Sequence, residues 1–136
     1  MKKILFLSLL ALAANFLSCT EETVLEPPYT NTPVIKSTTN AFSYVLAANS
    51  FSGNMEYELA FTSDSLAYSI VVSNYQSGSG SLTILDGKDT TVYTEPLQSN
   101  KVLAFTQANK GIPMRIKFLF NGFSGTLTLG LAKSST

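Results

Sequence analysis

The sequence predicts an all-β protein, a single antiparallel β-sandwich of jelly-roll type with about eight short strands. Three observations predict this fold. Apolar and polar residues alternate along most segments after residue 40, as they do in strands with one buried face. The same segments are rich in β-branched and aromatic residues, which suit a pleated surface. Gly, Asn, Asp and Ser interrupt the segments at short intervals, and no convincing amphipathic helix is present.

The individual strands are read from the alternation. Met55, Tyr57, Leu59 and Phe61 point to one side of an extended chain. The expected strands, in chain order, are 42–47, 55–61, 68–75, 81–85, 91–93, 102–106, 114–120 and 127–131.

Turn residues separate these expected strands. The stretch Ser77 to Gly80 lies between two of them, Asp86-Gly87 is a hairpin signal, and Asn121-Gly122 lies between the last two. The part from Gly80 to Leu131 resembles a pattern found in small extracellular β-sandwich modules. That resemblance implies a fold and no function.

The N-terminal residues carry a targeting pattern. Lys2 and Lys3 precede an apolar run, Ile4 to Ala14, of about eleven residues, which is too short for a helix that spans a bilayer. Ser18 and Cys19, the single cysteine of the chain, follow it. This arrangement resembles a bacterial lipoprotein signal peptide of the signal peptidase II type.

The resemblance implies cleavage after residue 18 and acylation of Cys19, and several acyl chains anchor a protein stably. Glu21 and Glu22, directly behind that cysteine, are similar to the signal that exports lipoproteins of the Bacteroidota to the cell surface. We therefore expect a lipid-anchored protein of the outer membrane, at the cell surface or, alternatively, on the periplasmic face. The other interpretation is a secretory signal with an unpaired cysteine.

The rest of the chain divides into a tether and one domain. Residues 19–39 contain Pro27, Pro28 and Pro33 and scattered apolar residues, which is typical of an extended spacer. Residues 40–136 are long enough for one small domain. The expected organisation is therefore a signal peptide at 1–18, a lipidated tether at 19–39 and a β-sandwich at 40–136.

The residue content restricts the chemistry. The chain has no histidine, which removes the usual general base, the Ser-His and Cys-His pairs and the commonest transition-metal ligand. The lone cysteine is used for the lipid in this interpretation. We expect a protein that is not an enzyme and that binds no metal or other cofactor.

Carboxylates offer the remaining catalytic alternative, a glycosidase or lyase. Such an enzyme needs two carboxylates facing one bond, and Glu56 and Glu58 share a face of one expected strand. We interpret them as part of a solvated outer face, and Arg115 and Lys117 as structural residues that pair with them or face solvent.

Two further patterns involve aspartates near turns. The run Asp86 to Asp89 has a carboxylate spacing that calcium can use, but the distal ligands of an EF-hand are missing and a plain hairpin explains it. The triplets that begin at Asp64 and Asp89 are similar to the O-glycosylation acceptor sequence of the Bacteroidota, which makes Ser65 and Thr90 candidate glycan sites.

Partners are restricted by charge and by aromatic content. The formal net charge of zero argues against nucleic acid. The chain has no tryptophan for sugar stacking, so a glycan-binding protein would need exposed tyrosines, with Tyr29, Tyr75 and Tyr93 as candidates near segment ends. A ring in the core with its hydroxyl at the rim is the expected state of each.

These observations favour a non-catalytic, lipid-anchored binding or structural module of the cell envelope, with an envelope protein or an extracellular glycan as partner. A glycan-binding accessory lipoprotein is the main alternative. The carboxylate enzyme is a second alternative. An inhibitor that inserts the loop at Ser77 to Gly80 or at Asn109 to Gly111 is a third.

Overall fold

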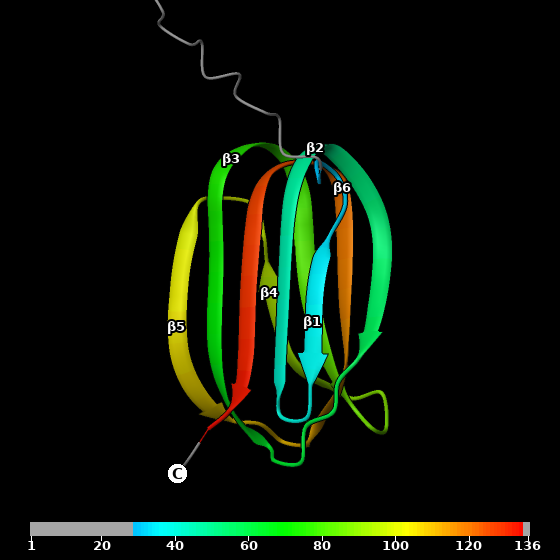
Figure 1. Ribbon diagram of the computed structural model, residues 1–136, viewed down its shortest axis with the longest axis vertical. Helices are drawn as coiled ribbons and strands as arrows, with labels where there is room; N and C mark the ends of the chain where they lie inside the picture. The colour runs from blue at the N-terminus through cyan, green and yellow to red at the C-terminus, as the bar shows by residue number, and fades with distance from the viewer. Residues whose placement is uncertain (1–28, 135–136) are drawn as a thin grey trace, which may run out of the picture.

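The computed structural model describes residues 29–134 and confirms the all-β antiparallel sandwich (Figure 1). The strands are β1 Val34–Thr38, β2 Ala41–Glu58, β3 Ser65–Asp86, β4 Thr91–Pro96, β5 Lys101–Ala108 and β6 Pro113–Lys133. The two ends of the described chain lie at opposite ends of the sandwich, the N-terminal end at the top of Figure 1.

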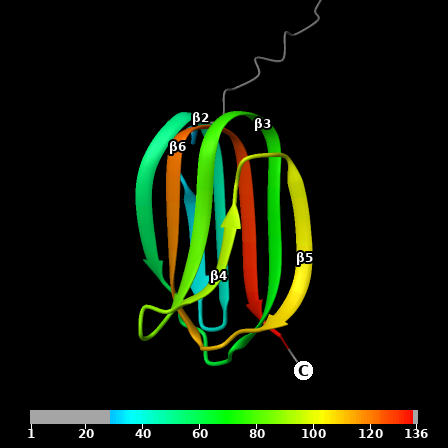
Figure 2. The same ribbon diagram turned by 180° about the vertical axis from the view of Figure 1, so that it is seen from behind.

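Three long strands connect the two layers. β2, β3 and β6 have 18, 22 and 21 residues, and the pairing register of each shifts midway along its length. At that point each strand bends from one layer into the other (Figures 1 and 2). Register shifts of this kind increase local twist and bend a strand, so they let one hydrogen-bonded sheet fold over onto itself.

We call the two layers sheet 1 and sheet 2. Sheet 1 has the strand order β1, β2, β6, β3, β5 and uses residues 41–48, 125–133 and 65–73 of the long strands. Sheet 2 has the order β2, β6, β3, β4 and uses residues 53–58, 113–120 and 79–86.

The prediction that turns separate strands at Ser77 to Gly80 and at Asn121-Gly122 is wrong. Both stretches lie inside strands, at the bends of β3 and β6. Gly78 and Gly122 have left-handed φ angles of 81° and 59°, which suit a bulge as well as a turn. Six of the eight expected strands therefore join in pairs into β2, β3 and β6. The Asp86-Gly87 hairpin is confirmed, since it joins β3 to β4.

The segment Val34–Thr38 lies within the expected tether, but it forms the edge strand β1, which pairs with β2 from Val34↔Val45 to Thr38↔Ala41. All five of its residues are exposed. Its sequence, Val-Ile-Lys-Ser-Thr, does not alternate apolar and polar residues, and alternation is the signal that predicts a half-buried strand. Thr30 also bridges to Ala47. The predicted tether is therefore too long at its C-terminal end.

The core consists of aromatic and aliphatic side chains from both layers. Tyr44 of sheet 1 stacks on Phe118 of sheet 2, with ring centroids 4.1 Å apart and an angle of 17° between the planes. Both rings are fully buried. Aromatic contacts of this kind add about 0.5 to 1.5 kcal/mol to the free energy of area burial, so this pair ties the layers together.

Candidate binding site

The residues of the lipoprotein pattern, Cys19, Glu21 and Glu22, lie outside the described residues. Within residues 29–134 there is no helix that is long and apolar enough to cross a membrane.

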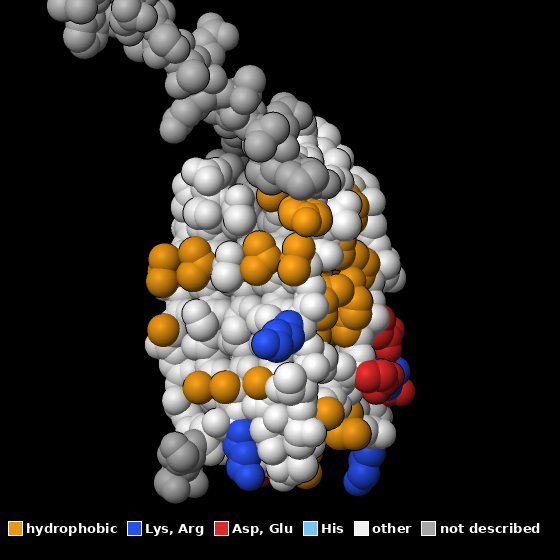
Figure 3. All heavy atoms as spheres, in the orientation of Figure 1, with side chains coloured by type: hydrophobic (Ala, Val, Ile, Leu, Met, Phe, Trp, Pro, Cys, Tyr) orange, Lys and Arg blue, Asp and Glu red, His pale blue; other side chains and the backbone are white. Residues whose placement is uncertain are grey.

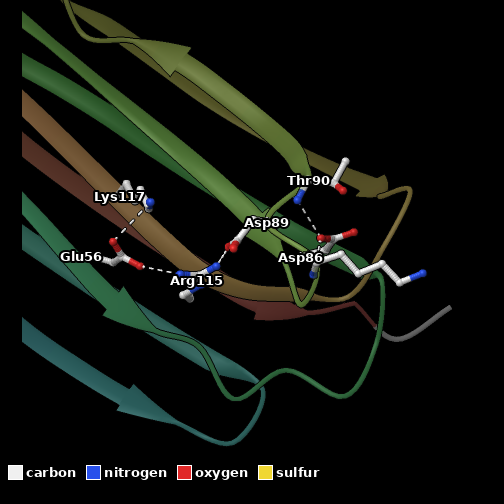
Figure 4. A network of polar contacts seen from close by, with 7 residues as sticks. Glu56, Asp86, Asp89, Thr90, Arg115 and Lys117 are labelled. Atoms are coloured by element: carbon white, nitrogen blue, oxygen red, sulfur yellow. Dashed lines mark hydrogen bonds and ion pairs between the residues drawn. The ribbon is translucent and has the colours of Figure 1, made fainter.

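The outer face of sheet 2 carries a chain of ion pairs (Figure 4). Glu56 Oε1 lies 3.0 Å from Arg115 Nη1, and Glu56 Oε2 lies 3.4 Å from Lys117 Nζ. Arg115 also contacts Asp89 of the hairpin. In the sheet register Glu56 is opposite Lys117, and Glu58 is opposite Arg115. Of the two alternatives left open by the sequence, pairing or facing solvent, the structure shows pairing for Arg115 and Lys117 with Glu56. Glu56, one of the two carboxylates that a glycosidase could use, is therefore held in ion pairs.

The hairpin between β3 and β4 uses its carboxylates for structure. Asp86 Oδ1 accepts hydrogen bonds from the backbone N–H groups of Thr90 and Lys88, at 2.9 and 2.8 Å. These two bonds, the one from Thr90 foremost, hold the pKa of Asp86 below its ordinary value. Asp89 has a left-handed φ of 64° and pairs with Arg115. Within residues 29–134 no three His, Cys, Asp or Glu side chains gather where they could hold a metal ion.

Glu95 forms a second, separate pair at the edge of β4. Lys101 Nζ lies 2.7 Å from Glu95 Oε1, and the Tyr93 hydroxyl donates a hydrogen bond to Glu95 Oε2 at 2.9 Å. Burial, followed by this bond and the neighbouring negative charge, raises the pKa of the Tyr93 hydroxyl. Glu95 is therefore held in a contact separate from the network that joins Glu56 and Asp89 through Arg115.

The candidate tyrosines divide into two groups. Tyr75 and Tyr93 have rings packed against the core, and their hydroxyls bond at the rim to the Gly78 carbonyl and to Glu95, as expected. Tyr29 differs, because its side chain is 56% exposed. The other tyrosines belong to the core or pack against it, so the described chain has no strip of exposed tyrosines on a sheet face.

The remaining candidates lie in ordered positions. Thr90 is exposed on the β3–β4 hairpin, whereas Ser65 is half-buried at the start of β3. Asn109 is only 6% exposed; its amide accepts from the Tyr68 hydroxyl and donates to the Asp64 carbonyl, each at 2.7 Å. The loop before β6 is therefore pinned to the core at Asn109.

Sequence reasoning missed the outer face of sheet 1, which we call the flat face. It comprises three rows of residues aligned across all five strands. The rows are Val34, Val45, Thr128, Val71 and Val102; Lys36, Ser43, Gly130, Ser69 and Ala104; and Thr38, Ala41, Ala132, Ala67 and Thr106. Lys36 is the single charged side chain among the three rows.

Figure 3 views the flat face directly: two bands of hydrophobic side chains cross it, and acidic side chains gather at one edge of the view. The small second and third rows leave a shallow depression of about 530 Å³, lined by Lys36, Ser43, Ala67 and Gly130 among others. Exposed strand faces usually carry mixed charges that keep a protein soluble. The signal in the sequence is the run of Ser, Thr, Ala and Gly at the outward positions of four strands.

A second concave feature lies next to the flat face, at the end where the long strands bend. We call it the corner groove. Its volume is about 340 Å³, and it is lined by three amides, Asn49, Asn74 and Gln76, and three hydroxyls, Thr30, Ser124 and Thr126, together with Ala and Gly residues. No charged residue lines it.

Comparison with known proteins identifies no family for this chain. No protein-family model matches the chain, and no curated protein matches it. Among solved structures, CsCBM6-3 from Clostridium stercorarium in complex with cellobiose is similar over 75% of this chain and 82% of that chain, with 13% identity and a TM-score of 0.29. At this level of similarity neither a ligand nor a residue role passes to the present chain.

Proposed function

We propose that this protein is a lipid-anchored, non-catalytic binding module of the bacterial outer membrane, displayed at the cell surface by acylated Cys19, and that it meets an envelope partner through the flat face. The observation that carries the proposal is the near absence of charge from three rows across five strands, whereas the outer face of sheet 2 carries an ion-pair network.

The size of the flat face sets the kind of contact. Five strands at about 4.8 Å spacing and three rows about 6.7 Å apart give roughly 480 Å². This is below the roughly 800 Å² per partner of a standard stable interface and suits a weak or transient contact. Anchoring both partners to one envelope raises their effective concentration, so a weak contact is sufficient.

The arrangement of the carboxylates supports a non-catalytic role. Glu56, Asp89 and Glu95 pair with basic side chains, and Asp86 is bonded to its own turn. A carboxylate enzyme needs one free acid and one free base that face a common cavity. These four carboxylates serve the fold instead.

The binding face is tested by photo-crosslinking in living cells. A photoreactive amino acid replaces Ser69 or Thr128 on the flat face, and Thr94 on β4 of sheet 2 serves as the matched control. We expect a discrete adduct of higher mass from the first two positions and none from Thr94. Equal labelling from both faces, or no adduct from the flat face, would contradict the proposal.

The anchor is tested separately. Cells that express the wild-type chain or Cys19→Ser are labelled with radioactive palmitate and fractionated. We expect label and envelope association in the wild type only, since the thiol accepts the lipid. Label on the serine variant would show that the anchor is misassigned.

A further inference from the structure

We infer that the corner groove is a binding site for a neutral, hydroxyl-rich ligand, that is, an uncharged glycan. The site is distinct from the flat face, and the inference does not depend on the partner that the flat face meets. It rests on amide side chains that the fold leaves unused, on the lack of charge around them and on the exposed ring of Tyr29.

The first step is the contrast between used and unused amides at this end of the sandwich. The Asn31 amide donates to the Asn49 carbonyl at 3.0 Å and accepts from the Asn49 N–H at 2.8 Å. The Asn100 amide oxygen accepts from the Tyr75 N–H at 2.9 Å. These two amides hold the backbone around the groove in place.

The amides that line the groove behave differently. Across residues 29–134, the side chains of Asn49, Asn74 and Gln76 are exposed and make no hydrogen bond. Each amide offers two N–H donors and one oxygen acceptor. The groove therefore presents six donors and three acceptors to whatever enters it.

The second step is the rigidity of the groove. Asn74 has a left-handed φ of 51°, and Ser50, next to Asn49, has a φ of 49°. Non-glycine residues rarely adopt this region, and such residues cluster at functional sites. The Ser50 N–H donates to Ser124 Oγ at 2.8 Å, and Ser124 is only 6% exposed. The backbone that presents these amides is thus fixed by hydrogen bonds to its neighbours, which lowers the entropy cost of binding.

The third step is the chemistry of the ligand. The groove has no charged residue, so it offers nothing to neutralise an anion or a cation. Sugar hydroxyls both donate and accept hydrogen bonds, which matches amides and hydroxyls. A volume of about 340 Å³ lies at the lower end of the range for small-ligand sites and suits one or two sugar rings.

Tyr29 supplies the remaining element. It directly precedes Thr30, which lines the groove, and its side chain is 56% exposed. An exposed aromatic ring offers an apolar face to the C–H side of a sugar ring. Tyr29 is the one exposed tyrosine of the described chain, and it is bonded through the peptide link to a residue that lines the groove.

The experiment is titration of the mature chain, purified from cells, with neutral hexasaccharides of glucose and of N-acetylglucosamine, followed by two-dimensional NMR and by calorimetry. Polygalacturonate is the anionic comparison. We expect at least one neutral oligosaccharide to shift the side-chain amide resonances of Asn49, Asn74 and Gln76. Polygalacturonate should shift none of them.

The variants are Asn74→Gly, which tolerates the left-handed backbone, and Gln76→Ala, with Asn54→Ala on the outer face of sheet 2 as the matched control. We expect each groove variant to raise the dissociation constant about tenfold and the control to leave it unchanged. Circular dichroism verifies that all three variants fold.

Two results would overturn the inference: no neutral oligosaccharide shifts the groove amides, or binding weakens equally in Asn54→Ala. In either case the crosslinking result at Ser69 and Thr128 is unaffected, so failure of the groove is distinguishable from failure of the flat face.

Discussion

Two glycines at the bends of β3 and β6 allow a sharp test of how the long strands change layers. Gly78 and Gly122 both have left-handed φ angles, 81° and 59°. A Cβ at Gly78 would overlap the Gly122 carbonyl oxygen and lie 2.6 Å from the Phe123 nitrogen, whereas a Cβ at Gly122 has no atom within 4 Å. Alanine at either position must adopt a left-handed backbone conformation. Only alanine at Gly78 would also clash with neighbouring backbone atoms.

The magnitudes follow from that difference. A left-handed conformation costs an L-residue about 1 to 2 kcal/mol, so Gly122→Ala should lower the free energy of unfolding by about that amount. Gly78→Ala carries the same cost plus that of forcing two backbones apart, about 1 to 3 kcal/mol more. The total of about 2 to 5 kcal/mol is a large part of the stability of a small domain.

The assay is urea denaturation followed by circular dichroism, on a chain that begins at residue 20 so that the lipid does not interfere. Both variants should keep the strand spectrum in the absence of urea. The expected order of stability is wild type, Gly122→Ala, Gly78→Ala. Equal losses in the two variants would refute the steric part of the reasoning, and the reverse order would refute the bend geometry itself.

Three further predictions concern the core, the loop before β6 and the β3–β4 hairpin. Phe118→Ala removes the stacking partner of Tyr44 from a fully buried site, and chemical denaturation should show a loss of about 3 to 5 kcal/mol. Asn109→Ala leaves the buried Tyr68 hydroxyl without its acceptor, and the same assay should show that the free energy of unfolding falls by about 1 to 3 kcal/mol. The double variant Tyr68→Phe with Asn109→Ala should lose less free energy of unfolding than the sum of the two single variants. Because the pKa of Asp86 is lowered in the folded state, its charge stabilises the fold above the unfolded pKa of about 3.9, and this contribution is lost as the pH falls through the lower folded value. The difference in unfolding midpoint between wild type and Asp86→Asn should therefore be present at pH 7 and vanish in acid, and a difference that persists at low pH would contradict this.

The sequence predicts the sandwich because alternation is a local signal. The strand halves around Tyr44, Ile70 and Phe118 each place every second side chain in the core, and that period is visible without knowing which strands pair. The hairpin at Asp86 is predictable for the same reason, since its carboxylate bonds to N–H groups two and four residues ahead.

The bends were misread because a glycine-rich break has two structural outcomes. A left-handed residue can close a hairpin or produce a bulge in a continuous strand. The choice at Gly78 and Gly122 depends on the fit between β3 and β6, and these two glycines are 44 residues apart in the sequence. β1 was missed because all of its side chains are exposed, and its pairing with β2 depends on backbone hydrogen bonds that any sequence can make.

The candidate site was the least predictable part. Small residues such as Ser69, Thr128 and Gly130 are individually ordinary, and only the register across five strands makes them one uncharged face. The groove amides Asn49, Asn74 and Gln76 come from two strands and meet only at the bend. The expectation that the Tyr29 ring lies in the core is wrong, because its side chain is 56% exposed.

The bend and the groove depend on the same close approach of strands. Gly125 lines the groove and has a φ of 154°, and a Cβ there would lie 3.1 Å from the Tyr75 Cα and 3.4 Å from the Asn74 carbonyl oxygen. Any larger residue at Gly125 must push β3 away from β6 at Asn74. We therefore expect Gly125→Ala to weaken folding and oligosaccharide binding together, whereas Gln76→Ala should weaken binding alone. If Gly125→Ala lowered stability while leaving the oligosaccharide affinity of its folded fraction intact, the position of Asn74 would not matter to the ligand, and the site would have to lie elsewhere on the sandwich.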